Sequence, residues 1–179
     1  MVSLKINGRK IKAEEGMTIL EAARANHIEI PTLCYNDALK PYGACRLCVV
    51  EIEKNGKTTV DTSCTYPVSD RLEVKTHTPR IHEARKMVLE LHLARCPNVS
   101  IVRELAAEHG ITASARQMGK DNEYCILCGL CVRACNEVVK AGAINFAGRG
   151  PVKMVDSPFG ETADDCIACG SCAFICPTG

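Results

Sequence analysis

Two short stretches near the C-terminus repeat the cysteine pattern C-x2-C-x2-C-x3-C. They read "YCILCGLCVRACN", with Cys125, Cys128, Cys131 and Cys135, and "DCIACGSCAFICP", with Cys166, Cys169, Cys172 and Cys176. A short loop with this spacing can place three thiolates at three corners of one cubic iron–sulfur cluster, and a remote fourth thiolate binds the last corner. Zinc also binds C-x2-C pairs, but it would leave the third cysteine of each triplet without a role. The pattern therefore favours two 4Fe–4S clusters and indicates an internal duplication.

The fourth cysteine of each run is expected to serve the other run. In bacterial two-cluster ferredoxins with this spacing, the fourth cysteine ligates the neighbouring cluster. We therefore assign one 4Fe–4S cluster to Cys125, Cys128, Cys131 and Cys176, and the other to Cys135, Cys166, Cys169 and Cys172. Gly129 and Gly170 lie inside the two loops, where a missing side chain lets backbone N–H groups approach the sulfurs, or simply allows a tight turn.

A third group of cysteines lies near the N-terminus. It contains Cys34, Cys45, Cys48 and Cys64, spaced C-x10-C-x2-C-x15-C. The plant-type 2Fe–2S spacing has only four residues in the first gap. One loop still carries three ligands and a separate segment brings the fourth, which suits a 2Fe–2S cluster. Zinc is a stronger rival here than in the C-terminal runs.

The elements expected around this third group are hairpins and one helix. Asn7-Gly8 and Asn55-Gly56 each predict a two-residue hairpin turn between alternating segments. Thr18 and Glu21 match a capping box, which predicts a helix over residues 18–26. This mixture is typical of a β-grasp arrangement.

From Thr78 onward the apolar residues recur with the period of a helix. Pro97 should end this helix, and a second helix is expected over residues 99–109, before Gly110. The buried stripe of the first helix is predicted to contain Ile81, Ala84, Met87, Val88 and Leu91.

The predicted fold class is α+β with three parts. They are an N-terminal β-grasp 2Fe–2S ferredoxin-like domain over 1–78, a short helical linker over 79–118, and a C-terminal bacterial-type two-cluster 4Fe–4S ferredoxin domain over 119–179.

Composition excludes several classes of protein. Lys plus Arg (22) nearly equal Asp plus Glu (21), so there is no basic field for nucleic acid. No apolar run approaches the roughly 20 residues that cross a bilayer, so we expect no direct membrane insertion. The opening "MVSLKINGRKIKAEEG" lacks the apolar segment of a signal peptide, and thirteen cysteines cannot all pair as disulfides. These features favour a protein of the reducing cytoplasm.

Four stretches together closely resemble the iron–sulfur subunits of NADH-linked modular oxidoreductases. They are "GMTILEAARANHIEIPTLCY", "YGACRLCVVEI", "YCILCGLCVRACNEVV" and "CIACGSCAFICPTG". The family includes the N-terminal part of the large peripheral subunit of respiratory complex I, the diaphorase small subunit of NAD-coupled hydrogenases, and the cluster-bearing front of iron-only and electron-bifurcating hydrogenases. The resemblance covers essentially the whole chain.

The resemblance implies an electron-transfer subunit without catalytic residues of its own. Its expected partners are a flavoprotein NAD(P)H-oxidising subunit, a small 2Fe–2S subunit and a further catalytic redox subunit, namely a hydrogenase, a formate dehydrogenase or a bifurcating transhydrogenase. No G-x-G-x-x-G follows a predicted strand, so we expect no flavin or NAD on this chain. The larger relatives continue into a catalytic domain, whereas this chain ends three residues after Cys176. We therefore expect it to transfer electrons without catalysing a reaction of its own. The alternative is a free polyferredoxin shuttle. We do not expect an iron–sulfur regulator, because the sequence contains no DNA-reading element.

Two potential iron ligands, His92 and Cys96, remain outside the three sites and lie in "LHLARCPNVSIVREL". Several relatives hold an additional 4Fe–4S cluster in this region through His-x3-Cys-x2-Cys-x5-Cys. His92 and Cys96 match the first two positions, but Val99 and Leu105 occupy the other two and cannot ligate iron. We predict that His92 and Cys96 bind no cluster, unless a partner completes the site. Electrons would then pass directly from the N-terminal cluster to the C-terminal pair, or one of these sites would instead connect to a cluster of a partner.

Overall fold

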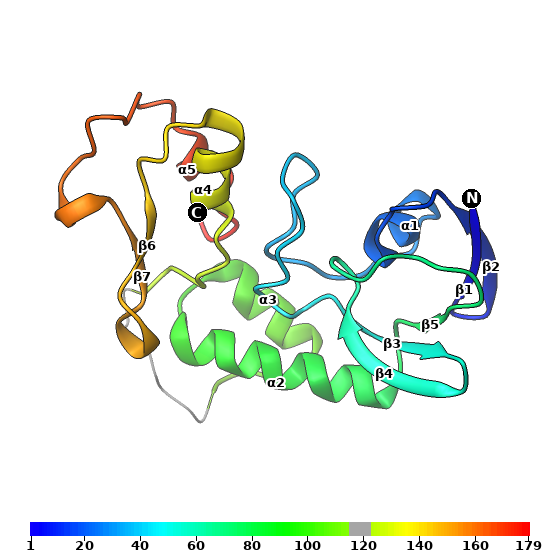
Figure 1. Cartoon of the computed structure of the whole chain (residues 1–179). Helices are drawn as coiled ribbons and strands as arrows, with labels where there is room; N and C mark the ends of the chain where they lie inside the picture. The colour runs from blue at the N-terminus through cyan, green and yellow to red at the C-terminus, as the bar shows by residue number, and fades with distance from the viewer. Residues whose placement is uncertain (115–122) are drawn as a thin grey trace.

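The computed structural model describes residues 1–114 and 123–179. Figure 1 shows an N-terminal sheet at one end, a pair of helices along the base and a cysteine-rich C-terminal part at the other end. The predicted boundary between residues 118 and 119 lies outside the described residues.

The N-terminal part is a five-stranded mixed sheet. Its strands are β1 (Val2–Ile6), β2 (Arg9–Ala13), β3 (Val49–Lys54), β4 (Lys57–Thr62) and β5 (Glu73–Lys75), in the order β2-β1-β5-β3-β4. β1 pairs with β5 in parallel, and the other neighbours are antiparallel. The turns at Asn7-Gly8 and Asn55-Gly56 have positive φ at all four residues, as tight hairpins with right-handed twist require. Both predicted hairpins are confirmed.

Helix α1 (Ile19–Ala25) packs against this sheet. The predicted capping box is present, because Thr18 Oγ1 accepts a hydrogen bond from Glu21 N at 3.2 Å and Glu21 Oε2 accepts one from Thr18 N at 2.6 Å. The helix buries Ile19, Leu20, Ala22 and Ala23 in a core shared with inward-facing strand residues such as Ile6, Val50, Ile52 and Val74. The β-grasp arrangement expected from the sequence is therefore confirmed.

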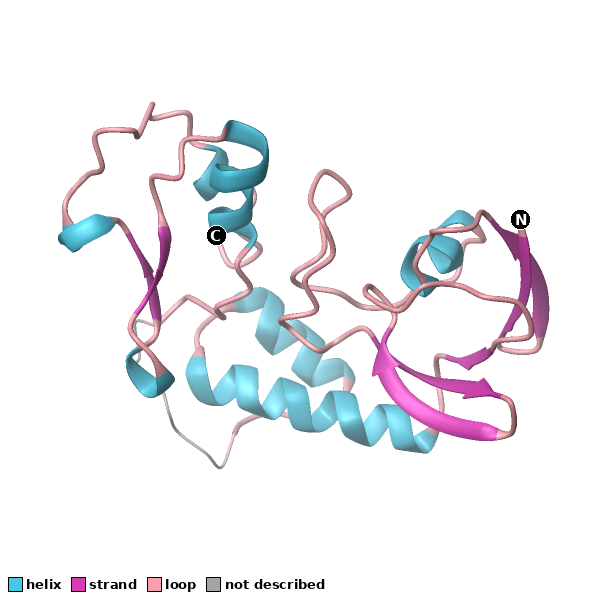
Figure 2. Cartoon of the chain, viewed as in Figure 1, coloured by secondary structure: helices cyan, strands magenta, loops and turns pink. Residues whose placement is uncertain are grey.

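Helices α2 (Pro79–Arg95) and α3 (Ser100–Glu108) form the base of the molecule (Figure 2). The predicted helices are present, but the predicted buried stripe of α2 was only partly right: Ile81 is buried, Ala84 and Val88 are half-buried, and the other two members are exposed. Met87 is 61% exposed and Leu91 is 43% exposed. Besides Ile81, the buried face contains Arg85, Leu89 and Leu93. Apolar periodicity could not indicate this face because it contains an arginine.

The C-terminal part consists of short elements around the two cysteine runs. They are α4 (Leu130–Arg133), the π-helical turn η1 (Ala134–Val139), β6 (Asn145–Ala147), η2 (Gly150–Val152), β7 (Met154–Asp156), η3 (Pro158–Gly160) and α5 (Ser171–Phe174). β6 and β7 form a small antiparallel hairpin. α4 and α5 are in contact, so the two runs lie side by side.

A second apolar core joins the three parts of the chain. It takes Leu33, Leu39 and Leu47 from the N-terminal part, Leu89, Leu93 and Val102 from the helix pair, and Ile126 and Leu130 from the C-terminal part. A shared core fixes the separation of the parts that it joins. Within the ranges 1–114 and 123–179, no helix is long and apolar enough to cross a membrane.

Candidate iron–sulfur sites

The four N-terminal cysteines come together in two close pairs. Cys34 hydrogen-bonds to Cys45, and Cys64 hydrogen-bonds to Cys48. Each bond lowers the pKa of the accepting thiol, that of Cys45 to about 5 and that of Cys48 to about 7, and raises the pKa of its donor. All four side chains are buried, with exposures of 1–2%.

The two pairs belong to different cores. Cys48 and Cys64 lie in the core of the β-grasp sheet, whereas Cys34 and Cys45 lie in the core shared with the helix pair and the C-terminal part. A two-iron cluster needs two thiolates for each iron, so the arrangement fits a 2Fe–2S cluster at the boundary between the cores. In the part of the chain that the structure describes, no three His, Cys, Asp or Glu side chains converge closely enough to hold a single metal ion.

Backbone amides and the helix pair hold the loop that carries Cys45 and Cys48. Cys45 N donates to Cys34 Sγ at 3.3 Å. Buried Arg85 of α2 donates from Nε to Leu47 O at 3.2 Å and from Nη2 to Val49 O at 3.0 Å. Burial lowers the pKa of Arg85, and the adjacent Cys48 opposes this shift. A cation beside the thiolates favours the more negative state of a bound cluster.

The first C-terminal run lies close to the last cysteine of the second run. Burial raises the pKa of Cys128 to about 11, and Cys131, Cys176 and Cys125 lie near enough to add to the shift. The pKa of Cys131 is raised by burial and also by Cys125 and Cys176. The structure thus brings together the four cysteines that the sequence assigned to one 4Fe–4S cluster.

The other four cysteines surround a small apolar cavity. Its volume is about 80 Å³, and its lining includes Cys135 with Cys166, Cys169 and Cys172. The last three are exposed, unlike the N-terminal cysteines. Burial of the three sites therefore decreases along the chain, and the second-run site is the most accessible to a partner.

The two C-terminal loops have the same backbone shape. Gly129 and Gly170 have φ of 74° and 71°, and each precedes the short helix of its run. Leu127 and Ala168, two residues earlier, also have positive φ, at 55° and 53°. Sequence reasoning singled out the glycines but missed these two residues, although the repeated C-I-x-C places them in register. Turns of this shape can direct backbone N–H groups toward an anion, and Leu127 N donates to Cys125 Sγ at 3.4 Å.

His92 and Cys96 have partners that suit structural roles. His92 Nε2 is hydrogen-bonded to the carbonyl oxygen of Cys45 at 3.1 Å. Cys96 is fully buried, its N–H caps α2 by bonding to His92 O, and burial raises its pKa to about 11. Val99, at the third position of the relatives' motif, is buried in the shared core.

Sequence reasoning missed the arginines that hold the ligand loops. Besides Arg85, Arg95 Nε donates to Cys125 O at 2.8 Å, and Arg133 Nη2 donates to Cys34 O at 3.1 Å. Of these arginines, only Arg133 had a position in the sequence that could have indicated such a role, because it lies between two ligands of its run. Arg46, also between two cysteines, instead forms an exposed ion pair with Asp61 at 4.0 Å.

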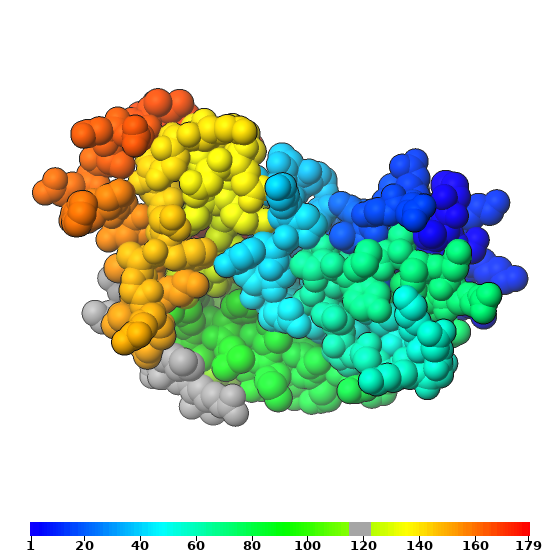
Figure 3. Space-filling model, in the orientation of Figure 1, coloured from blue at the N-terminus to red at the C-terminus, as the bar shows by residue number. Residues whose placement is uncertain are grey.

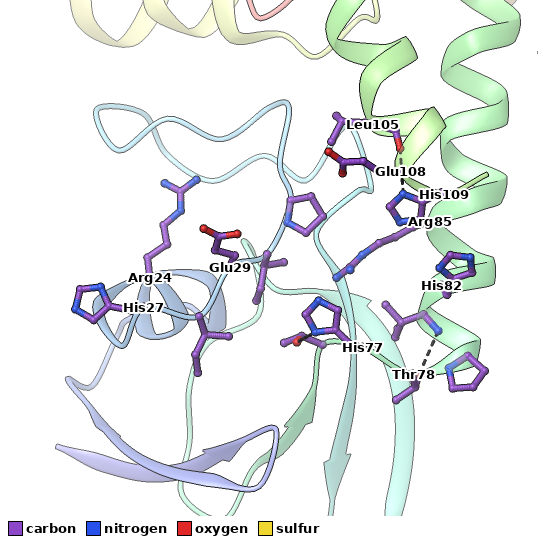
Figure 4. A pocket seen from close by; sticks show the side chains of 16 residues that line it. Arg24, His27, Glu29, His77, Thr78, His82, Arg85, Leu105, Glu108 and His109 are labelled. Atoms are coloured by element: carbon purple, nitrogen blue, oxygen red, sulfur yellow. Dashed lines mark hydrogen bonds between the residues drawn. The ribbon is translucent and has the colours of Figure 1, made fainter. Parts of the chain in front are cut away.

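A histidine-rich cleft lies between α1 and the helix pair (Figure 4). Its volume is about 1010 Å³, and four of the five histidines line it: His27, His77, His82 and His109. His82 and His109 stack with ring centroids 5.1 Å apart. Arg85 also lines this cleft, so it connects the cleft with the N-terminal ligand loop.

Comparison with known proteins identifies both cysteine-rich regions. Residues 1–79 match the model of the 2Fe-2S iron-sulfur cluster binding domain, and residues 124–179 match that of the 4Fe-4S dicluster domain. A solved NAD+-reducing [NiFe]-hydrogenase has a chain that is 30% identical and superposes with a TM-score of 0.78, over 90% of this chain and 79% of that one. The chain therefore belongs to the family of iron–sulfur subunits that combine an N-terminal 2Fe–2S domain with a 4Fe–4S dicluster domain.

Curated members of the family extend well beyond the matched region. The whole iron–sulfur chain is 35% identical to the NADP-reducing hydrogenase subunit HndD of Solidesulfovibrio fructosivorans and covers 35% of it. It is 34% identical to the NADPH-Fe(3+) oxidoreductase subunit alpha of Geobacter sulfurreducens and 32% identical to a subunit of the NADH-quinone oxidoreductase of Rhizobium meliloti, covering 24% of each. The iron–sulfur chain thus spans between a quarter and about a third of these relatives.

Proposed function

We propose that this chain relays electrons between a flavoprotein NAD(P)H-oxidising subunit and a further redox module. The observation that carries the proposal is the gathering of twelve cysteines into three sites on one framework, with one site buried and one exposed. When bound, iron–sulfur clusters accept and release single electrons. The residues of the chain set the separation, burial and surrounding charge of those clusters.

The proposed ligands are those expected from the sequence. Cys34, Cys45, Cys48 and Cys64 would hold the 2Fe–2S cluster; Cys125, Cys128, Cys131 and Cys176 one 4Fe–4S cluster; and Cys135, Cys166, Cys169 and Cys172 the other. The proximity of Cys176 to Cys128 and the cavity beside Cys135 support the crossed ligation. The matched ranges 1–79 and 124–179 support the division into domains 1–78 and 119–179 with a linker over 79–118.

The proposed partners follow from the relatives, which are subunits of hydrogenases and of NADH- or NADPH-linked oxidoreductases. Flavin and nicotinamide would bind to a partner subunit, and the exposed second-run site would face the next redox module. We place this assembly in the reducing cytoplasm, which the thirteen unpaired cysteines support.

The decisive experiment is anaerobic purification followed by metal analysis and redox titration. One 2Fe–2S and two 4Fe–4S clusters require about ten irons per chain. Stoichiometric zinc with little acid-labile sulfide would refute the cluster assignment. Co-purification of a flavoprotein from the native source would support a subunit, whereas recovery of the iron-loaded chain alone would favour the free polyferredoxin shuttle.

A further inference from the structure

The ten residues between Cys34 and Cys45 form a loop that leaves the β-grasp part and reaches the C-terminal part. We call residues 35–44 the finger. Figure 1 shows the finger standing between the N-terminal sheet and α4, and Figure 3 shows its surface against that of the C-terminal part. The plant-type spacing has only four residues in this gap, so the ten-residue finger contains the extra chain length of this ligand spacing.

Arg133 of α4 contacts the middle of the finger and the ligand residue that precedes it. Its guanidinium donates from Nη1 to Lys40 O and from Nη2 to Cys34 O, the latter at 3.1 Å. Lys40 N in turn donates to Glu137 Oε2 at 3.0 Å. Residues almost one hundred positions apart are thus joined by three hydrogen bonds that involve a charged group, the stronger class of such bonds.

The aromatic ring of Tyr42 adds packing to these bonds. Arg133 Cζ lies 5.3 Å from the centroid of the Tyr42 ring. A Cβ placed on Gly129 would come within 3.4 Å of Tyr42 Cε1, so the ring lies directly against the first-run loop. Leu39 of the finger is buried in the shared core with Leu130 and Ala134.

Arg133 lies close to cysteines of all three proposed sites. Arg133 lies between Cys131 and Cys135, which are assigned to the two different 4Fe–4S clusters, and it bonds to the peptide of Cys34, which is assigned to the 2Fe–2S cluster. Its Nε is buried with no hydrogen-bond partner among residues 1–114 and 123–179. A buried donor without a partner is costly unless a bound group accepts from it. A cluster sulfur or thiolate would be such an acceptor.

We propose that Arg133 and the finger form the coupling element between the 2Fe–2S site and the 4Fe–4S pair. Arg133 is a positioning residue: it fixes the finger on the C-terminal part and places a positive charge between the sites. This inference rests on the proposed relay.

The test compares Arg133→Gln and Arg133→Lys with Arg149→Gln in the iron-loaded full chain. Arg149 is exposed and belongs to the same part of the molecule, so its substitution is a matched loss of charge. Arg133→Gln removes the bonds to Lys40 O and Cys34 O that hold the finger, so the finger should open more often. The Lys40 amide, which donates to Glu137, reports this opening, and we expect its hydrogen exchange to rise roughly 10- to 100-fold, as for loss of a charge-assisted bond. The midpoint potential of the 2Fe–2S cluster should fall, and the magnetic interaction between the reduced clusters should weaken.

Arg133→Lys separates charge from position. Lysine restores the positive charge but cannot make the forked pair of bonds, so the potential should return toward the wild-type value while the Lys40 amide stays fast. If Arg133→Gln loses iron, the exchange of Arg133→Lys is compared with that of Arg149→Lys. Wild-type exchange of the Lys40 amide in both Arg133 variants, or a wild-type potential in Arg133→Gln, would overturn the inference. Failure of the relay itself is a different result, because the wild-type chain would then lack the expected iron.

Discussion

His92 Nε2 lies 3.1 Å from the carbonyl oxygen of Cys45, across 47 positions of sequence. The imidazole on α2 thereby holds the loop that carries two N-terminal cysteines. The family resemblance noted from the sequence would make a histidine at this position a cluster ligand. Here it has a hydrogen-bonding role that needs no metal.

We predict that replacing His92 and Cys96 together by Ala leaves the iron content unchanged. Neither residue belongs to a proposed site, so all three clusters should remain reducible. Iron analysis and electron paramagnetic resonance of the anaerobic protein measure this. Loss of about four irons would show that a fourth cluster had been present.

Arg85→Met should destabilise the N-terminal ligand loop. Buried Arg85 bonds to Leu47 O and Val49 O, and methionine would leave both carbonyl groups without this donor. We expect the free energy of unfolding to fall by about 2–4 kcal/mol, as for other buried carbonyl groups that lose a charged partner. Denaturant titration of the iron-loaded protein, followed by 2Fe–2S absorbance, measures the change.

Arg80→Met is the matched control for Arg85→Met. Arg80 is exposed in the first turn of the same helix, so its loss should change stability by no more than about 0.5 kcal/mol. Equal effects of the two substitutions would mean that the carbonyl contacts of Arg85 contribute nothing.

Gly129→Ala should cost more than Gly170→Ala, although the two glycines occupy the same position in the repeated loops. Both have positive φ, so each alanine should cost about 1–2 kcal/mol through backbone conformation. At Gly129 the added Cβ would also meet Phe146 Cζ at 3.1 Å, whereas nothing lies within 4 Å at Gly170. Crowding of this kind adds about 1–3 kcal/mol. Thermal unfolding of both variants tests the difference, and equal costs would contradict it.

Cys176→Ser should perturb the 4Fe–4S cluster assigned to Cys125, Cys128 and Cys131. The proximity of Cys176 to Cys128 and Cys131 supports this pairing. Electron paramagnetic resonance of the separately reduced clusters can show which one changes. Cys96→Ser is the control, because it makes the same substitution at a buried thiol outside the proposed sites and should retain every signal. A change confined to the second-run cluster in Cys176→Ser would refute the crossed assignment.

Local features of the fold were predictable because short segments determine them. The Asn-Gly turns and the Thr18–Glu21 capping box depend on residues no more than three positions apart, and all are present. The buried face of α2 was predicted only at Ile81, because Arg85 is buried by contacts with Leu47 and Val49, which lie in and just before β3. Hydrophobic periodicity assumes that buried residues are apolar, and a buried arginine paired with carbonyl groups breaks that assumption.

The sequence by itself determined which residues can bind iron and what local shape their loops take, because ligand type and short spacing set both. Only the tertiary structure decided which side chains hold those loops: Arg85, His92 and Arg133 reach their carbonyl partners across 38, 47 and 99 positions. It also placed one pair of N-terminal cysteines in each of two cores. Such contacts depend on how separate elements pack together, and no local pattern of residues encodes that packing.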